Sequence, residues 1–449
     1  MQQVRAQNPR EAFHTLDPFA LVQPNDAWYF DLEHHLDLKH YPLKAKLDLL
    51  FYRPDFVQAS DYVQIGVVGH KGTGKTTQLR KYMNELETSH NITPVFVDVL
   101  STLDQADLSF ADVVLILVQS VAEALKETPG KSNQFPNAQY QLVKNWFSEE
   151  LLTETHTKEI NAALETEASA KGGIPYLANM MAKITATLKT DNQYRTEIRR
   201  RAERDPNELI RNVNIFLDAA SLSFGEPSKP RTIAVVFDNL EKITNRELVD
   251  IAVLQRADDL RKLRCHLLLF LDPADQFAPK TRMVSDVFSF VLVPMLPVRA
   301  ETDDFDHVDG QTLNAITALL EKRLDTQLVF DDPHACIEEI SRKSGGRLRD
   351  VLALTRRACE NVFTGKIGLQ DVKDASESLT NERVTAVKPN QWSRLAQIHH
   401  DKKIANDADD AHLLLHSLVL NYNGKQWFDV HPLVSLDKRF TDAWQKLKP

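Results

Sequence analysis

The sequence predicts an α/β fold built on an open, mostly parallel sheet, followed by a helical domain and a winged helix. Two observations support this prediction. Before residue 300, short apolar segments alternate with helical sequence, as parallel strands alternate with crossover helices. After residue 309 the helical periodicity continues without such strands, until two strand-like segments flank an Asn-Gly pair near the C-terminus.

The expected strands of the sheet are short and apolar. They cover residues 63–68, 94–99, 232–237, 266–271 and 290–293. A crossover between parallel strands needs only about 30 residues, so the long stretch between residues 100 and 231 contains an insertion as well as a crossover. Its sequence is helical in period, clearest at residues 151–168 and 176–188, with Gly172-Gly173-Ile174-Pro175 as an interior break.

The C-terminal part predicts two further domains. Expected helices of a small helical domain cover residues 311–324, 333–342, 348–361 and 369–378, and those of the last domain lie near residues 392–399 and 409–417. Strands at 418–422 and 426–430 flank Asn423-Gly424, a strong hairpin signal, and helices followed by a hairpin predict a winged helix. We therefore expect these domains: an N-terminal segment (1–60), a sheet domain (61–298) with its helical insertion (about 105–230), a helical lid (299–380) and a winged helix (385–449).

Composition sets the broad class. The 449 residues, 43% of them apolar, are enough for about two to four packed domains. No segment is long and apolar enough to cross a bilayer and the N-terminus has no apolar signal core, so we expect a cytoplasmic protein without a membrane partner. Cys265, Cys336 and Cys359 fit no metal spacing and are expected in the core. A net charge of −9 disfavours a duplex-DNA binder with a generally basic surface.

A glycine-rich turn directly after the first strand predicts the central chemistry. It reads Gly69-His70-Lys71-Gly72-Thr73-Gly74-Lys75-Thr76-Thr77, and a helix is expected from residue 75 to 86. In such a strand-to-helix turn the backbone N–H groups point at phosphates, Lys75 reaches the terminal phosphates and the Thr76 hydroxyl holds Mg²⁺. The turn therefore predicts a nucleoside-triphosphate site, with ATP or ADP and Mg²⁺ as the expected cofactors.

Two acids after the third expected strand complete the predicted site. That strand ends in Asp238-Asn239-Leu240-Glu241, where Asp238 can orient the Mg²⁺ shell opposite Thr76. An acid directly after Asp238 would be the expected general base, but that position is Asn239. Glu241 is then the nearest candidate to polarise water, with capping of the next helix as the alternative. An enzyme that relies on Glu241 is expected to hydrolyse slowly, which suits a switch better than a motor.

Arginines and aromatics elsewhere give further candidates. In Gly345-Gly346-Arg347-Leu348-Arg349-Asp350 an arginine, Arg349 first, could contact the γ-phosphate; a solvated basic first turn is the alternative. In the run at residues 194–201, Arg195 or Arg199 could reach a neighbouring subunit's γ-phosphate, or the run is a solvated helix face. Trp28, Tyr29 and Phe30 are expected to anchor the N-terminal segment to the sheet, with packing on adenine as the alternative.

The ordered set of motifs resembles a known superclass. The phosphate loop at residues 69–76, the acids at 238–241, the strand ending Phe270-Leu271-Asp272, the arginine motif at 346–349 and the winged helix resemble the AAA+ superclass. Within it they are similar to the STAND signalling ATPases, a relative of the origin-recognition type, over roughly residues 61–434. The resemblance implies a first sensor at the strand end near Asp272 and a second sensor at residues 346–349.

The resemblance also gives a role to a histidine. The winged helix ends in Val430-His431-Pro432-Leu433-Val434. In STAND proteins a histidine at this place faces the ADP phosphates and helps hold the off state, so the resemblance implies that role for His431, with an ordinary hairpin residue as the alternative. STAND proteins usually carry sensor repeats and often an effector domain. The sequence up to Pro449 shows neither, so the resemblance implies that sensing or effector work lies in the helical insertion or in a partner chain.

Three functions fit these motifs. The leading hypothesis is an ATP-dependent switch that forms a homo-oligomer and controls a separate effector or sensor protein, with bacterial anti-phage defence as the setting that the resemblance points to. The second is a DNA-associated loader or transposition regulator, which the acidic balance and a wing, Asn423-Gly424-Lys425, with only one basic residue disfavour. The third is a nucleotide-binding scaffold that never hydrolyses.

Overall fold

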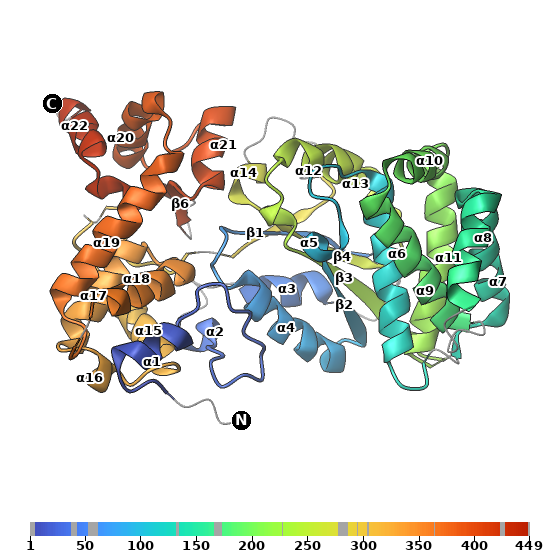
Figure 1. Ribbon diagram of the computed structural model, residues 1–449, viewed down its shortest axis with the longest axis horizontal. Helices are drawn as coiled ribbons and strands as arrows, with labels where there is room; N and C mark the ends of the chain where they lie inside the picture. The colour runs from blue at the N-terminus through green and yellow to red at the C-terminus, as the bar shows by residue number, and fades with distance from the viewer. Residues whose placement is uncertain are drawn as a thin grey trace.

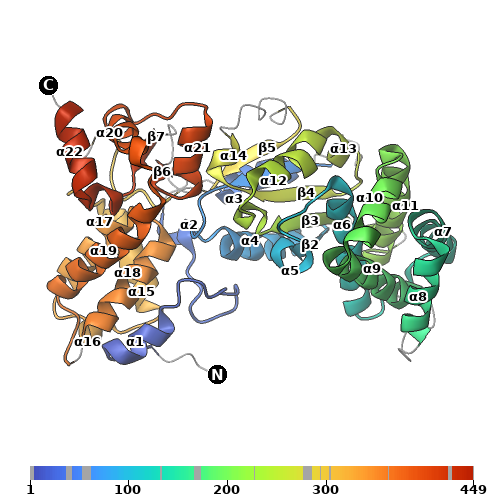
Figure 2. The ribbon, with the colours of Figure 1, turned by 45° about the horizontal axis from the view of Figure 1, so that its top comes forward.

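The computed structural model describes residues 5–36, 43–52, 62–131, 134–165, 173–226, 228–276, 286–293, 295–302, 305–362, 364–422 and 427–447. Three parts follow one another along the long axis: a helical bundle, a central sheet domain, and a lid with the C-terminal domain beside it (Figure 1). A view turned by 45° keeps the bundle and the C-terminal domain at opposite ends (Figure 2). The sheet domain therefore joins two parts that are well separated from each other.

The sheet is parallel across its described strands, in the order β2-β3-β4-β1-β5. The strands are β1 (Gln64–Val68), β2 (Ile92–Asp98), β3 (Thr232–Asp238), β4 (His266–Leu271) and β5 (Ser289–Leu292). The predicted α/β class and all the predicted strands are confirmed, with small shifts at the strand ends. Since β4 lies between β1 and β3, the loops after β1, β4 and β3 meet at one edge of the sheet.

Both faces of the sheet are buried, which explains why the strands are continuously apolar. Successive residues of a strand point to opposite faces. Val235 and Phe237 of β3 belong to a core shared with the helical insertion. Val236 of β3 and Phe270 of β4 belong to a second core, shared with the N-terminal segment and the lid.

The predicted insertion is a helical bundle on one face of the sheet. Its elements, with the short helix that precedes them, are α5 (Val99–Thr102), α6 (Phe110–Glu127), α7 (Asn137–Asn145), η2 (Trp146–Leu151), α8 (Glu154–Glu165), α9 (Gly173–Thr190), α10 (Asn192–Ala202) and α11 (Pro206–Phe224). Ser109 and Asp112 form a capping box at the start of α6, which satisfies free N–H groups of its first turn. Gly172 of the expected break lies outside the described residues, and α9 begins at Gly173.

Further helices surround the strands. The helix after the phosphate loop, α4 (Lys75–Ser89), extends three residues beyond its predicted end. The connections between β3 and β5 hold η3 (Leu240–Lys242), α12 (Arg246–Ala252), η4 (Leu254–Arg256), α13 (Ala257–Arg261) and α14 (Pro273–Gln276).

The predicted lid is helical and holds the N-terminal segment. Its helices are α15 (Gly310–Glu321), α16 (Thr326–Val329), α17 (Pro333–Ser344), α18 (Leu348–Asn361) and α19 (Leu369–Arg383). The N-terminal helices are α1 (Pro9–Thr15), α2 (Leu32–His35) and α3 (Leu43–Phe51). The α1 helix packs on α18, and the Ala6 N–H donates to the carbonyl of Arg323 (2.9 Å), so the segment before the sheet domain is attached to the lid.

The C-terminal domain has the predicted winged-helix order. It consists of η6 (Val384–Ala386), η7 (Pro389–Gln391), α20 (Trp392–Asp401), α21 (Ala408–Leu415), β6 (Val419–Tyr422), β7 (Trp427–Val430), η8 (Val434–Leu436) and α22 (Lys438–Leu447). β6 and β7 pair antiparallel. The expected turn and wing, Asn423-Gly424-Lys425, lie outside the described residues. The α21 helix packs on α14, so this domain is docked directly on the sheet domain.

Candidate functional site

The loop after β1 has the backbone that a phosphate cradle needs. Gly72 and Gly74 adopt φ of 88° and 86°, a region that side chains rarely adopt. At Gly72 there is also no room for a side chain, because a Cβ would lie 2.5 Å from the Cβ of Arg349. The turn delivers the chain directly into α4, whose first residue is Lys75. The free N–H groups of that first turn are the ones that bind an anion at a helix N-terminus.

Lys75 is buried within this loop. Its ammonium donates to the carbonyls of Gly69 (2.6 Å) and His70 (2.9 Å), and lies 3.6 Å from a carboxylate oxygen of Glu241. Burial lowers the pKa of Lys75, and Glu241 opposes that effect. The charge of Lys75 is thus held in place by two carbonyls and one carboxylate, and its contact with terminal phosphates stays a prediction.

The carboxylate of Asp238, at the end of β3, contacts the start of α4. Thr76 Oγ1 donates to Asp238 Oδ1 (2.9 Å), and the N–H of Asn239 donates to the same oxygen (2.9 Å). Burial raises the pKa of Asp238. A hydroxyl and a carboxylate beside a phosphate cradle are the oxygen ligands that Mg²⁺ takes together with nucleotide phosphates. Thr76 and Asp238 therefore fit the predicted magnesium role.

Two more carboxylates line this edge. Glu241 is buried, contributes to the cavity described below, and its Oε2 has no hydrogen-bond partner among the described residues. Asp272, directly after β4, is buried as well, and burial with repulsion from Asp275 raises its pKa to about 6. Glu241 thus lies at the cavity with one oxygen unpartnered among the described residues, and its proton-accepting role stays a prediction.

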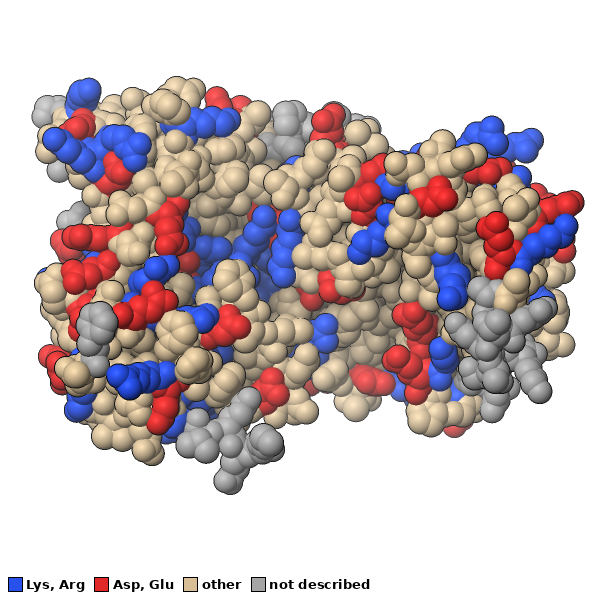
Figure 3. Space-filling model, in the orientation of Figure 1, with Lys and Arg blue, Asp and Glu red and all other residues tan. Residues whose placement is uncertain are grey.

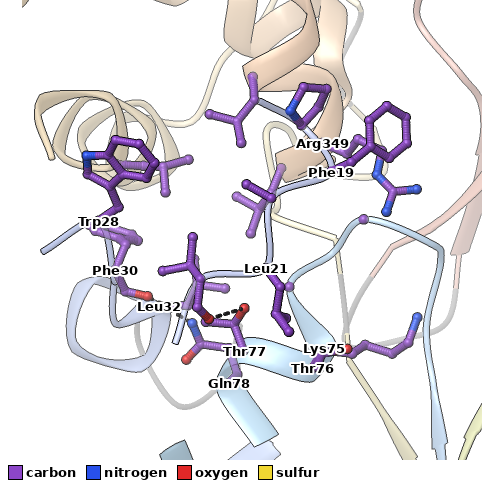
Figure 4. Close-up of a pocket in the computed structure, with 18 of the residues that line it drawn as sticks. Phe19, Leu21, Trp28, Phe30, Leu32, Lys75, Thr76, Thr77, Gln78 and Arg349 are labelled. Atoms are coloured by element: carbon purple, nitrogen blue, oxygen red, sulfur yellow. Dashed lines mark hydrogen bonds between the residues drawn. The ribbon is translucent and has the colours of Figure 1, made fainter. Parts of the chain in front are cut away.

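These groups open into one cavity of about 260 Å³ between the sheet domain, the N-terminal segment and the lid. Lys75, Thr76, Asp238 and Glu241 form its polar end. Its other wall is mostly apolar and consists of Trp28, Phe30, Leu32, Leu319, Leu348 and Leu352, with Arg323 among them. Figure 4 shows Trp28 and Phe30 well apart from Lys75, at the far side of the cavity. A polar end and an apolar end are what a nucleotide needs for its phosphates and its base.

Of the N-terminal aromatics, Phe30 is buried in the core that the N-terminal segment shares with the sheet, as the expectation of anchoring predicts. Trp28 and Phe30 line the cavity, the position of the alternative prediction, whereas the Tyr29 hydroxyl donates to Gln78 Oε1 (3.3 Å). The segment is held by the first turn of α4. The Thr77 hydroxyl donates to the carbonyl of Val22 (3.2 Å), and Gln78 Nε2 donates to that of Phe30 (2.8 Å). Thr77 therefore fixes the cavity wall through its side chain.

Arg349 lies at the cavity, as the second-sensor prediction requires. Its backbone N–H donates to the carbonyl of Gly72 (3.0 Å), and its side chain lines the cavity. The guanidinium lies over the ring of Phe19, 5.0 Å from the ring centre. Phe19 is 75% exposed and crosses the cavity mouth together with Leu21 (Figure 4). Burial lowers the pKa of Arg349.

His431 lies away from the cavity, in a buried ionic cluster between lid and winged helix. The carboxylate of Asp350 is shared by Arg347 (3.1 Å), Arg383 (2.8 Å) and His431 (2.8 Å). The N–H of Leu433 donates to His431 Nδ1, so Nε2 carries the proton and donates to Asp350. Burial and Arg383 lower the pKa of His431 to about 3, which keeps it neutral. His431 therefore contacts the lid in this structure, and not the place of the phosphates as the resemblance implied.

The outer side of the phosphate loop is held by the other domains. His70, predicted as part of the cradle, is buried, and its Nε2 accepts from the N–H of Asn421 in β6 (3.0 Å). Arg347 Nε donates to the carbonyl of Lys71 (2.6 Å). Thr73 is turned inward, with its hydroxyl on the carbonyl of His70. These residues give the loop its shape and its contacts, while Gly72, Gly74, Lys75, Thr76 and Thr77 line the cavity itself.

Arg195 and Arg199 are not brought to the cavity. Both lie on α10 in the insertion bundle, where Arg195 pairs with Asp104 (2.7 Å) and Asp107 (2.9 Å). Arg199 pairs with Asp107 (2.7 Å) and Asp112 (2.5 Å). Because their charges are matched within the bundle, this arrangement disfavours the predicted reach to a neighbouring subunit.

Positive charge gathers near the site. In the space-filling view, Lys and Arg side chains cluster in the hollow between the sheet domain and the lid side of the molecule (Figure 3). Lys75, Lys242, Arg323 and Arg349 line the cavity, against the acids Asp238 and Glu241. The excess of cations at the cavity suits a polyanionic ligand, although the whole chain is acidic.

Neither a protein-family model nor a curated protein matches the chain. Three solved structures are similar to it over nearly its whole length: the Aeropyrum pernix ORC2 protein in ADPNP-ADP complexes (12% identity, 99% of each chain, TM-score 0.39), Cdc6p from Pyrobaculum aerophilum (13%, 95% of this chain and 99% of the other, 0.38), and the Aeropyrum pernix ORC1 protein in complex with DNA (12%, 94% and 97%, 0.35). These neighbours are archaeal ORC/Cdc6 proteins, which are AAA+ P-loop ATPases.

Among the described residues, no helix combines the length and the apolar character that a bilayer crossing requires.

Proposed function

We propose that this chain is a nucleotide-dependent switch: ATP with Mg²⁺ binds in the cavity, and the nucleotide state sets the position of the lid and the winged helix. One observation supports the proposal above all. Among the described residues, the phosphate loop accepts hydrogen bonds from both the lid and the winged helix. The carbonyls of Gly72 and Lys71 accept from Arg349 and Arg347 of the lid, and His70 Nε2 accepts from Asn421 of the winged helix. The loop binds the phosphates on one side and contacts the lid and the winged helix on the other. Nucleotide binding at the loop therefore affects the positions of these two domains.

The site residues divide the work as follows. The loop amides and Lys75 bind the β- and γ-phosphates, and Thr76 with Asp238 would hold the metal, whose charge would offset that of the phosphates. Glu241, with a free carboxylate oxygen, accepts the proton of the attacking water. Because Lys75 lies 3.6 Å from the same carboxylate and weakens it as a base, turnover is slow.

Arg349 reports the presence of the γ-phosphate. In the structure its guanidinium lies on Phe19 at the cavity mouth. A third phosphate is a stronger partner for a guanidinium than an aromatic ring is, because it offers charge-assisted hydrogen bonds. Arg349 therefore leaves Phe19 when a triphosphate is bound, and α18 moves with it.

The switch belongs, in our proposal, with STAND-type ATPases that assemble into homo-oligomers and control a separate effector, with anti-phage defence as the setting. The buried Asp350 cluster joins the lid to the winged helix, and in our proposal it stabilises the closed state of the switch. Opening would break those contacts and uncover surface of the lid and winged helix on which copies can assemble.

DNA binding is the second candidate, because winged helices often grip duplex DNA. The surface near the hairpin does not favour it. The α21 helix directly before the hairpin follows the exposed Asp407 and carries the exposed Asp409, and it is packed on α14. A helix that reads a DNA groove needs a free face and, for affinity, basic neighbours.

The test combines nucleotide binding with mass measurement on the full chain. ATP binding by calorimetry should be lost in Lys75→Ala, and a non-hydrolysable ATP analogue with Mg²⁺ should shift light scattering of the wild type to a larger species. Unchanged ATP affinity in Lys75→Ala would reject the site. One mass in every nucleotide state would reject assembly, and tight duplex binding that weakens with salt would favour the DNA candidate instead.

A further inference from the structure

Arg323, just after α15, is a buried cation that has no carboxylate partner among the residues that the structure describes. It is only 5% exposed, and burial alone lowers its pKa to about 10. The other buried arginines of the described chain, Arg195, Arg299 and Arg347, each pair with an aspartate. Burying an unpaired charge is costly, and a ligand that offers hydrogen-bond acceptors would offset part of that cost.

Arg323 lies at the apolar end of the nucleotide cavity. Its guanidinium donates one long hydrogen bond, 3.4 Å, to the carbonyl of Trp28, and lies 5.8 Å from the centre of the Trp28 ring. Both residues line the cavity. Figure 4 places Trp28 on the side of the cavity opposite Lys75. Because Arg323 contacts Trp28, it belongs to that end of the cavity, where the base is expected.

A second donor in the same place is also free. The Nε1–H of Trp28 is buried and has no hydrogen-bond partner among the described residues. The carbonyl oxygens of Phe30 and Trp28 in this wall already accept hydrogen bonds from Gln78 and Arg323. This end of the cavity therefore has hydrogen-bond donors that lack acceptors among the described residues. A ligand whose edge carries hydrogen-bond acceptors would fit there.

We propose that Arg323 reads the base of the nucleotide, by donating to acceptor atoms on the edge of a purine. The purine edge carries N7 in adenine, and N7 beside O6 in guanine, the pair to which arginine binds most often in nucleic acids. A purine extends further from its ribose than a pyrimidine does, so we expect only a purine to reach the Trp28 wall when its triphosphate is held by Lys75. This inference rests on the proposed nucleotide site and deepens it by naming the residue that selects a purine.

The test compares ligands with and without the base. Kd values for ATP, GTP, CTP and inorganic triphosphate are measured by calorimetry for the full-length wild type, Arg323→Met, Trp28→Phe and a matched control, Lys322→Met, at the exposed neighbouring position. Arg323→Met should weaken ATP and GTP by about tenfold or more, the loss expected for a hydrogen bond from a charged group. It should leave CTP and inorganic triphosphate unchanged, and Lys322→Met should change none of the four. Trp28→Phe, which removes only the N–H donor, should weaken the purines less.

Thermal unfolding separates this role from a structural one. Replacing a buried unpaired charge by an apolar side chain of similar length should keep or raise the unfolding temperature of Arg323→Met. A lower unfolding temperature together with equal losses for all four ligands would overturn the proposal, as would unchanged ATP and GTP affinity. If the wild type binds none of these ligands, or if Lys75→Ala binds them as well as the wild type does, the nucleotide site itself fails, which is a different outcome.

Discussion

Asp350→Asn tests the connection between lid, winged helix and phosphate loop. The substitution keeps the size of the side chain and removes its charge. Burial of Asp350 raises its pKa, but the charges of Arg347 and Arg383 and the hydrogen bond from His431 outweigh this and hold the pKa well below the ordinary value. Asp350 is therefore ionised in the fold, and asparagine leaves two arginines without their carboxylate.

The expected cost follows from that geometry. Breaking a buried ion pair by removing one partner costs about 3–5 kcal/mol, and here the loss is confined to the lid–winged helix junction. Hydrogen exchange of β6 and α18 should therefore become faster in Asp350→Asn. Since Arg347 also donates to the carbonyl of Lys71, the phosphate loop should loosen too, and bound ADP should leave several-fold faster by stopped-flow fluorescence.

The control is Asp410→Asn. Asp410 is buried and paired with Arg394 (2.5 Å), but both lie inside the winged helix. This variant should lose comparable local stability without any change in ADP release. Equal ADP release in Asp350→Asn, Asp410→Asn and the wild type would refute the coupling, even if both variants are destabilised.

Three further outcomes are expected. Glu241→Gln should lower ATP turnover by about a hundredfold while ATP still binds, and wild-type turnover in this variant would favour the non-hydrolysing scaffold. Phe19→Ala should release Arg349 and shift the ratio of ATP to ADP affinity about two- to fivefold toward ATP, from a cation–π contact of about 0.5–1 kcal/mol. Leu21→Ala, two residues along the same segment, serves as control and should not change that ratio. His431 has a folded pKa of about 3, below the value of about 6.5 in an unfolded chain. The unfolded state therefore binds more protons in this window, and stability that is present above pH 6.5 is lost as pH falls. Between these values the wild type should lose about 1.4 kcal/mol per pH unit relative to His431→Gln, which keeps a donor but does not titrate; parallel pH profiles in denaturant unfolding would contradict this.

Much of the fold could be predicted because local signals agree with the global arrangement. The strands are continuous apolar runs since both sheet faces are buried. The glycines at 72 and 74 and the helix start at Lys75 form a local motif, and the meeting of Thr76 with Asp238 follows from the parallel strand order. These features depend on short stretches of chain and on general rules of sheet topology.

The parts that the sequence could not predict depend on long-range packing. His70 lies within the phosphate motif, yet its ring accepts a hydrogen bond from β6, more than 300 residues away in the sequence, because the winged helix docks on the loop. The Arg195 and Arg199 run looks solvated in sequence, but its partners are acids on and just before α6. Nothing in the sequence marks Arg323, since its significance comes from burial without a carboxylate partner among the described residues, which only the assembled lid and N-terminal segment create.

The central claim is that nucleotide at the phosphate loop sets the position of the winged helix. Its most direct test is the distance between labels at Glu127→Cys, at the end of α6, and Lys403→Cys, after α20, both exposed in the structure. The native cysteines are buried, so labelling is selective. The label distance, from single-molecule energy transfer, should differ between the ADP state and the state with a non-hydrolysable ATP analogue and Mg²⁺, and Lys75→Ala should show one distance throughout. The same distance in both nucleotide states of the wild type, with binding verified, would contradict the account.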